Sequence, residues 1–312
     1  LSHKVAYCVR CGVCEIECPT GALDLTMGVH IDDRLCIHCG SCLNFSEKGC
    51  LAAKSLSVSQ EGANTMKGVN RYQGFGMKKE WLERFLRDPD AWWLDHGIGN
   101  LQAESMKVWL RESEIISKNN VTELGKKLRD KSVNDPFSWG IIWTNLSQNS
   151  KLIQWYTENI PWGSEFSSKE MVDLLDNKMA LRTRTNAITA LFYLFEGSPL
   201  GSFGIGTIRR AKRQRVLAKI GWFDVPDLAI LYSMYRLAEK QSNHNMTVSQ
   251  LTEEQSCGPS RLFGLDRETL TKSLRRLASN YSEQISINIL RDLENIQLDS
   301  RFSCLDIVGL SG

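Results

Sequence analysis

Eight cysteines near the amino terminus have the residue type and the spacing of iron–sulfur ligands. The first four, Cys8, Cys11, Cys14 and Cys18, form the run C-x2-C-x2-C-x3-C followed by Pro19, and Cys36, Cys39, Cys42 and Cys50 follow as a second run. Three closely spaced thiolates can hold three corners of one cubane, and the cysteine before the proline serves the other cluster. The sequence therefore predicts two [4Fe-4S] clusters, one held by Cys8, Cys11, Cys14 and Cys50, the other by Cys36, Cys39, Cys42 and Cys18.

Zinc and disulfides are the simpler alternatives for these cysteines. Zinc sites usually combine two C-x2-C pairs and do not need a triple run closed by Cys-Pro. A disulfide framework suits a small secreted domain, and this sequence has no recognisable signal peptide. The spacing thus favours iron–sulfur clusters over both. Crossed ligation favours electron relay, although a purely structural role for the clusters stays open.

Composition places the chain among ordinary globular proteins. Its 312 residues, 42% hydrophobic and 24% charged, are enough for two or three domains. It has no apolar run long enough to span a bilayer, so we expect no membrane association. The two remaining cysteines, Cys257 and Cys304, are expected to be small apolar fillers. Free thiols and oxygen-sensitive clusters together predict a reducing, cytoplasmic location. The chain begins with Leu1, which suggests that further sequence precedes it.

The pattern along the chain predicts an α+β amino-terminal domain over residues 1–57, a linker over 58–70, and a mainly α domain over 71–312. Leu23–Leu25 and Ile31 alternate around Met27-Gly28 as in a small hairpin. Residues 78–94 suit a helix that breaks at Asp88-Pro89. Residues 1–60 carry five basic and six acidic side chains, which leaves a net charge of +3 for the rest. This asymmetry permits a nucleic-acid partner for the larger domain.

Three later stretches share a predicted plan of helix, turn, helix and a short strand pair. They cover Asn100–Leu128, the residues from Ser167 to Gly197, and Thr247–Leu298. Ser167 and Glu170 predict a capping box, and Gly197 predicts a helix end. Asp266 is expected to cap a helix, and Ile285 is expected to begin a strand after it. The plan is typical of winged helix-turn-helix modules, although a helical bundle that only packs would contain similar pairs.

Basic side chains gather in and near these modules. Six lie within eleven residues, with no acid between Gly197 and Phe223, and if that stretch were helical they would cover more than one face. Phosphates attract such groups with little regard to sequence, whereas a merely solvated face is the alternative. The predicted DNA contacts are Arg182, Arg184, Arg209, Arg210, Lys212, Arg213, Arg215, Lys219, Lys272, Arg275 and Arg276.

Other motifs do not indicate a catalytic site. The glycine-rich residues 201–206 lack the lysine of a phosphate-binding loop, and the histidines show no ligand spacing. Asp88, Asp90 and Asp95, or Asp130 with Asp135, could hold Mg²⁺, but acids near helix ends are usually caps. The sequence thus predicts no catalytic residue.

Two resemblances extend this interpretation. Residues 1–57 resemble two-cluster bacterial ferredoxin modules, and the stretches 37–45 and 48–56 look like the ferredoxin segment fused to phosphoadenosine-phosphosulfate-reductase-like proteins. Leu51 stands where that pattern has a second proline. Most of the remainder resembles a bacterial domain family of unassigned function. The matching segments are Asp135-Pro136-x-x-Trp139, Phe166–Glu170, Ser198-Pro199-Leu200-Gly201, Asp227–Tyr232 and Phe263–Asp266.

The second resemblance implies a biological setting. That family occurs with the machinery that replaces a non-bridging oxygen of the DNA backbone by sulfur, a phage-defence modification called phosphorothioation. The implied partners are a cysteine desulfurase, a reductase-like ATP pyrophosphatase and an ATPase. Some family members are linked with DNA nicking, but no nuclease motif matches here. The pyrophosphate loop of the reductase-like domain is absent from this sequence, so phosphate adenylylation would need a preceding domain or a separate subunit.

The sequence therefore predicts an electron-relay and DNA-engaging component of a DNA phosphorothioation complex. It is expected to be part of an oxidoreductase or sulfurtransferase system rather than a self-sufficient enzyme. Two alternatives stay open: a redox-sensing regulator whose cluster state changes DNA affinity, and an electron-carrier subunit of a metabolic oxidoreductase.

Overall fold

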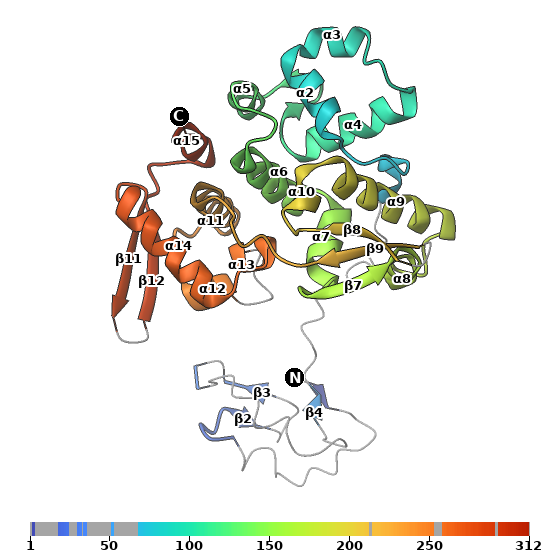
Figure 1. Cartoon of the computed structure of the whole chain (residues 1–312). Coiled ribbons are helices and arrows are strands. Elements are labelled where there is room, and N and C mark those ends of the chain that lie inside the picture. The colour runs from blue at the N-terminus through green and yellow to red at the C-terminus, as the bar shows by residue number, and fades with distance from the viewer. Residues whose placement is uncertain are drawn as a thin grey trace. The chain divides into compact units, whose positions relative to one another are not determined.

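The chain consists of two compact parts, which we describe separately. A computed structural model describes residues 2–3, 18–24, 30–32, 34–35, 51–52, 68–211, 214–252, 258–290 and 293–311. The parts are Leu1–Thr65, here the N-terminal part, and Met66–Gly312, here the body (Figure 1). Within the described ranges, no helix has both the length and the apolar character needed to cross a bilayer.

Two short antiparallel strand pairs are described in the N-terminal part. Strand β2 (Leu23–Asp24) pairs with β3 (His30–Ile31), and Leu23 lies opposite Ile31. This confirms the small hairpin predicted around Met27-Gly28. Strand β1 (Ser2–His3) pairs with β4 (Leu51–Ala52). The second pair joins the start of the chain to the residues directly after Cys50.

The body is mostly helical, with small antiparallel sheets. Its helices are η2 (Val69–Tyr72), α2 (Lys79–Arg87), α3 (Pro89–Leu94), α4 (Asn100–Glu112), α5 (Glu123–Arg129), α6 (Pro136–Asn149), α7 (Lys151–Asn159), α8 (Ser168–Leu174), α9 (Leu181–Gly197), α10 (Pro199–Ser202), α11 (Asp227–Gln241), α12 (Val248–Thr252), α13 (Pro259–Phe263), α14 (Arg267–Asn280) and α15 (Cys304–Gly309). Its strands are β5 (Ile116–Ser117), β6 (Asn120–Val121), β7 (Ser164–Ser167), β8 (Thr207–Ala211), β9 (Gln214–Lys219), β10 (Asn245–Thr247), β11 (Ile285–Leu290) and β12 (Leu293–Leu298).

The first part of the body, up to α6, confirms one prediction and corrects another. The break at Asp88-Pro89 is present, because Asp88 accepts a hydrogen bond from the Ala91 amide and Pro89 begins α3. The plan predicted for Asn100–Leu128 is wrong. Its strand pair, β5 with β6, lies between α4 and α5 rather than after a second helix. A tight two-stranded turn therefore replaces the expected module.

Residues 151–219 form what we call the central subdomain, with the order α7, β7, α8, α9, α10, β8, β9. Its three-stranded antiparallel sheet has the strand order β7-β9-β8. The capping box is present, since Ser167 accepts from the Glu170 amide and Glu170 accepts from the Ser167 amide. Helix α9 ends at Gly197, as predicted.

Residues 227–298 form the C-terminal subdomain and repeat this plan as α11, β10, α12, α13, α14, β11, β12. Its sheet has the corresponding strand order β10-β12-β11. Asp266 accepts from the Thr269 amide at the start of α14, and Ile285 begins β11, both as predicted. The order helix, strand, three helices, strand, strand thus occurs twice. The long helix before the hairpin is α9 in the central subdomain, where the short α10 follows it, and α14 in the C-terminal subdomain, where the short α13 precedes it.

A joint of three glycines connects the two subdomains. The amides of Ile220 and Gly221 donate to the Gly204 carbonyl at 2.9 and 3.0 Å. Gly264, before α14, has a φ of +76°, and a Cβ atom there would lie 2.8 Å from the Gly221 Cα. Because a left-handed φ and this close approach both favour glycine, the backbones meet without side chains between them.

Candidate functional site

Cys18 is the predicted cluster ligand that falls within the described residues. It is half-buried, and its Sγ lies 3.7 Å from the Thr20 hydroxyl oxygen. Hydrogen bonds from Thr20, first from its amide and then from its hydroxyl, lower the pKa of this thiol. Since the thiolate is the form that binds iron, the surroundings of Cys18 fit a cluster ligand. The other predicted ligands lie outside the described residues: Cys8, Cys11, Cys14, Cys36, Cys39, Cys42 and Cys50.

The strongest basic stretch forms a β-hairpin, not a helix. Strands β8 and β9 pair antiparallel, and Lys212 and Arg213, which come between them in the sequence, lie outside the described residues. Arg210 lies opposite Arg215, whereas Arg209 lies opposite Val216. Successive residues of a strand point to opposite faces, so Arg209 is on one face of the sheet and Arg210 and Arg215 are on the other. The stretch is therefore not the helix that was considered as one possibility, because β8 and β9 pair antiparallel.

Three predicted contacts of the central subdomain are engaged within the chain. Arg209 forms an ion pair with Glu165 across the sheet. Arg215 approaches Glu196 at 3.3 Å, and its guanidinium lies 5.1 Å from the centre of the Tyr193 ring. Arg184 donates to the Val172 carbonyl at 3.0 Å and so holds α9 to α8.

Lys219 was predicted to contact DNA, and its position in the structure contradicts this. Its side chain is 1% exposed, so it cannot reach a phosphate. Its ammonium donates to the Ile160 carbonyl at 2.6 Å and lies 4.4 Å from the centre of the Trp162 ring. Burial, followed by the nearby Arg261 guanidinium, lowers the pKa of Lys219 to about 7. Its strand position explains the error, because it shares the inward face of β9 with the buried Leu217.

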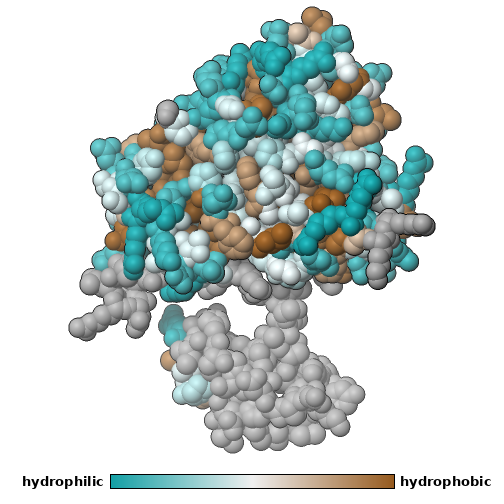
Figure 2. Space-filling model, viewed as in Figure 1, coloured by the Kyte–Doolittle hydropathy of each residue, from teal (hydrophilic) through white to brown (hydrophobic). Residues whose placement is uncertain are grey.

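Helix α14 presents its predicted basic side chains to solvent. Lys272 pairs with Glu268 one turn earlier at 2.6 Å, and both are exposed. Arg276 makes two hydrogen bonds, of 2.7 and 2.6 Å, to the Asp227 carboxylate. Arg275 is exposed and has no ion-pair partner within the described part of the chain. Figure 2 shows hydrophilic side chains gathered over α14 and over the β8–β9 hairpin on the face in view.

A buried polar cluster that the sequence did not reveal fixes the start of the body. The Tyr72 hydroxyl donates to Glu112 at 2.5 Å and lies 2.5 Å from the Ser150 hydroxyl. Arg71 pairs with the same carboxylate at 2.8 Å. Burial raises the pKa of Glu112, although the Tyr72 hydrogen bond and Arg71 oppose the shift. The cluster therefore anchors η2 to α4 and α7.

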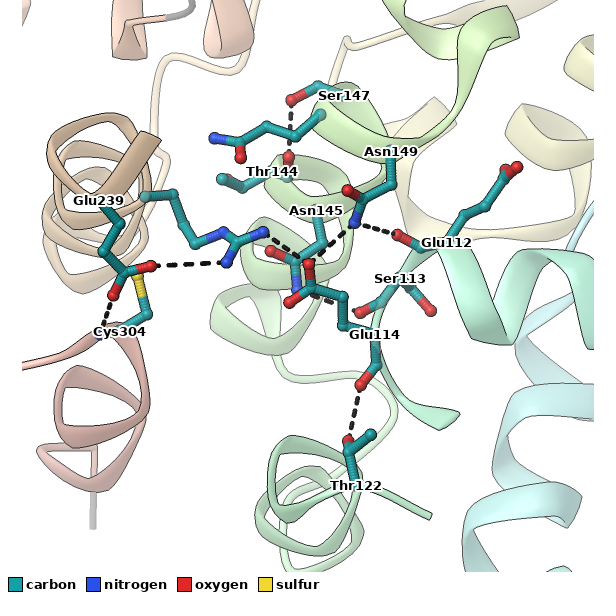
Figure 3. Close-up of polar contacts among 12 residues, drawn as sticks. Glu112, Ser113, Glu114, Thr122, Thr144, Asn145, Ser147, Asn149, Glu239 and Cys304 are labelled. Carbon is teal, nitrogen blue, oxygen red and sulfur yellow. Dashed lines mark hydrogen bonds and ion pairs between the residues drawn. The ribbon is translucent and has the colours of Figure 1, made fainter. Parts of the chain in front are cut away.

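A second polar cluster surrounds Glu114, which adopts a left-handed φ of +63° just after α4 (Figure 3). Its carboxylate accepts from Arg236 at 2.6 Å and from Asn149 at 2.9 Å. Glu239 also contacts Arg236, at 3.5 Å, and accepts from the Cys304 amide. Helices α4, α6, α11 and α15 thus meet here. Cys304 is buried, which agrees with its predicted role as a filler, and burial raises the pKa of its thiol.

Comparison with known proteins relates the fold to solved structures. No family model matches the sequence, and no curated protein matches it. A magnesium ion-bound crystal structure of SspB matches with a TM-score of 0.59 and 13% identity, covering 77% of this chain and 85% of that chain. Over that share of its length, this chain has the fold of SspB. A further SspB crystal structure gives a TM-score of 0.58 at 12% identity.

The magnesium in one SspB structure raises the question of a metal site in this chain. Within the described residues, no cluster of three or more His, Cys, Asp or Glu side chains could hold a metal ion. Asp88 and Asp135 cap α3 and α6 through backbone amides, and Asp95 accepts from the Gly97 amide. Asp88 and Asp135 are therefore helix caps, as predicted.

Proposed function

We propose that this chain is an iron–sulfur electron-relay and DNA-engaging component of a DNA phosphorothioation complex. The observation that carries the DNA half is the topology of the two subdomains. Apart from one additional short helix, α10 or α13, each subdomain has a helix, a strand, two helices and a strand hairpin, with the first strand beside the last. This is the plan of a winged helix-turn-helix module, and each subdomain offers basic side chains on a long helix or a hairpin. Exposed positive charge of this kind binds phosphates.

The relay half rests on the cysteine motif and on its fit to the N-terminal part. The cysteines would hold two cubanes, which supply one-electron transfer when bound. The lowered pKa of Cys18 suits a thiolate ligand. Strand β1 precedes Cys8 in the sequence, strand β4 follows Cys50, and the two strands pair. This pairing supports the assignment of Cys50 to the same cluster as Cys8, Cys11 and Cys14. The phosphorothioation setting, with its desulfurase, reductase-like and ATPase partners, comes from the sequence resemblance. The likeness to SspB supports the fold.

Two measurements on the full chain test the electron-relay part and the DNA-binding part of the proposal separately. Anaerobically reconstituted protein should carry about eight iron ions per chain, and far fewer irons, or zinc in their place, would end the relay proposal. The reconstituted protein should also bind duplex DNA with an affinity that falls linearly on a log–log plot against salt. A flat plot would end the DNA proposal and leave the iron result intact.

The second candidate is the redox-sensing regulator. This candidate predicts a large difference in DNA affinity between oxidised and reduced protein, whereas a pure relay predicts nearly equal affinities.

A further inference from the structure

We infer that the C-terminal subdomain reads DNA bases through α14, whereas the central subdomain, despite the same topology, does not insert α9 into a groove. This inference rests on the DNA engagement proposed above. It assigns different tasks to the two repeats, and the assignment comes from the surfaces of the two corresponding helices.

Most of α9 is covered. Gly76 lies against the backbone of Tyr193 and Leu194, and a Cβ atom on Gly197 would lie 2.9 Å from the Lys78 side chain. A helix must present a free side-chain face to enter a major groove. Because the segment before α2 lies along its second half, α9 lacks such a face there.

The side chains of α9 that remain exposed are also unsuited to contact DNA. After Thr185, its exposed side chains are Tyr193 and Glu196. Arg215 of the hairpin contacts both of them. A carboxylate is repelled by phosphates, and a side chain held by the neighbouring strand is not free to reach a base. Only the first turn, with Arg182, is open and basic.

Helix α14 has an uncovered face, and on that face two basic side chains outnumber one acidic side chain. Glu268, Lys272, Arg275 and Ser279 are exposed. Their spacing of four, three and four residues places them on one face of the helix. Both side chains of the Lys272–Glu268 pair are exposed, so a competing phosphate or base can displace this ion pair at little cost.

Arg275 is the residue best suited to read a base. It is exposed at the middle of this face and has no ion-pair partner within the described residues. An arginine in this situation can donate two parallel hydrogen bonds to O6 and N7 of guanine. Arg276, by contrast, is already held by two hydrogen bonds to Asp227. We therefore assign base recognition to Arg275 and phosphate contact to Lys272.

Matched double variants test the assignment on the full reconstituted chain with a mixed-sequence duplex long enough to cover both subdomains. Lys272→Gln with Arg275→Gln removes two exposed charges from α14, and Arg182→Gln with Arg210→Gln removes two from the central subdomain. We expect the first pair to weaken binding about tenfold to hundredfold and, because only Lys272 is assigned to a phosphate, to reduce the salt slope by about 0.9. The second pair should weaken binding only severalfold. Thermal unfolding of each variant checks that the fold is kept.

A conservative variant separates base reading from charge. Arg275→Lys keeps the charge but loses the planar pair of donors. It should leave the salt slope unchanged and reduce the sequence preference seen when duplexes are selected from a pool with a randomised core. An equal or larger loss from the central pair, or an unchanged preference in Arg275→Lys, would overturn the inference while DNA binding itself stands. A flat salt plot for the unaltered protein would instead remove the proposed function.

Discussion

The central and C-terminal subdomains share one topology but bury different surfaces. In α9, buried residues surround most of the helix, from Ala187 to Phe195. In α14, burial is confined to Leu270, Ser273, Leu274 and Leu277, so one face packs and the other is open. The comparison teaches that a repeated fold does not imply a repeated function. The segments that pack against each subdomain decide which of the two can present its long helix to a ligand.

The largest expected effect comes from disturbing the cover of α9. Gly76→Ala would place a Cβ atom 2.0 Å from the Leu194 amide nitrogen, and neither backbone can move without disturbing the core. We expect the free energy of unfolding to fall by about 3 kcal/mol or more, measured by urea denaturation. Gly99→Ala is the control, since its nearest neighbour would be 3.7 Å away. Similar losses for the two variants would show that the segment is not seated on α9.

A smaller loss is expected from Tyr72→Phe, which weakens the anchor of the same segment. The variant removes the hydroxyl that bonds to Glu112 and Ser150, and so leaves a buried carboxylate with one partner fewer. The expected cost is about 2 kcal/mol in the free energy of unfolding. Tyr193→Phe serves as the control, because that ring is 38% exposed and its change should cost under about 0.5 kcal/mol. If Tyr72→Phe costs no more than this control, the cluster is not an anchor.

Lys219, which lies close to the joint between the subdomains, should make stability depend on pH. Its pKa is about 7 in the folded chain and 10.5 when exposed, so the unfolded chain binds more protons between these values. Stability should therefore rise with pH above 7, by up to about 1.4 kcal/mol per pH unit. Below pH 7 both states are protonated and this contribution is flat.

Lys219→Met should remove that rise, which is measured by urea denaturation of both proteins between pH 7 and 8.5. Contributions from the raised pKa values of Cys304 and Tyr156 are present in both proteins and cancel in the comparison. Parallel curves for the two proteins would contradict the buried, partly deprotonated lysine.

The smallest effect should come from Arg276→Gln in the C-terminal subdomain. This guanidinium is half exposed and bound to Asp227, so its loss should cost under about 1 kcal/mol of stability. DNA affinity should change less than in Arg275→Gln, because Arg276 is already occupied. Fluorescence anisotropy with the same duplex compares the two variants. A larger loss for Arg276→Gln would move base recognition to that residue.

Local patterns in the sequence predicted the elements that depend on neighbouring residues. The Ser167–Glu170 capping box, the Asp266 cap and the end of α9 at Gly197 are all set within a few positions. The hairpin of residues 207–219 was not predicted, because its many charged residues obscure the alternation of inward and outward side chains that is typical of a strand. Leu217 and Lys219 are the residues that point inward. The Tyr72–Glu112 contact joins residues 40 positions apart, and no local signal reports such a pair.

The glycine joint has a consequence for the DNA binding proposed above. Gly204, Gly221 and Gly264 hold the two subdomains in direct backbone contact. The distance between the β8–β9 hairpin and α14 is therefore fixed. If both regions contact one duplex as proposed, inserting half a helical turn of base pairs between their two contact sites would place the sites on opposite sides of the duplex, and inserting a full turn would return them to one side.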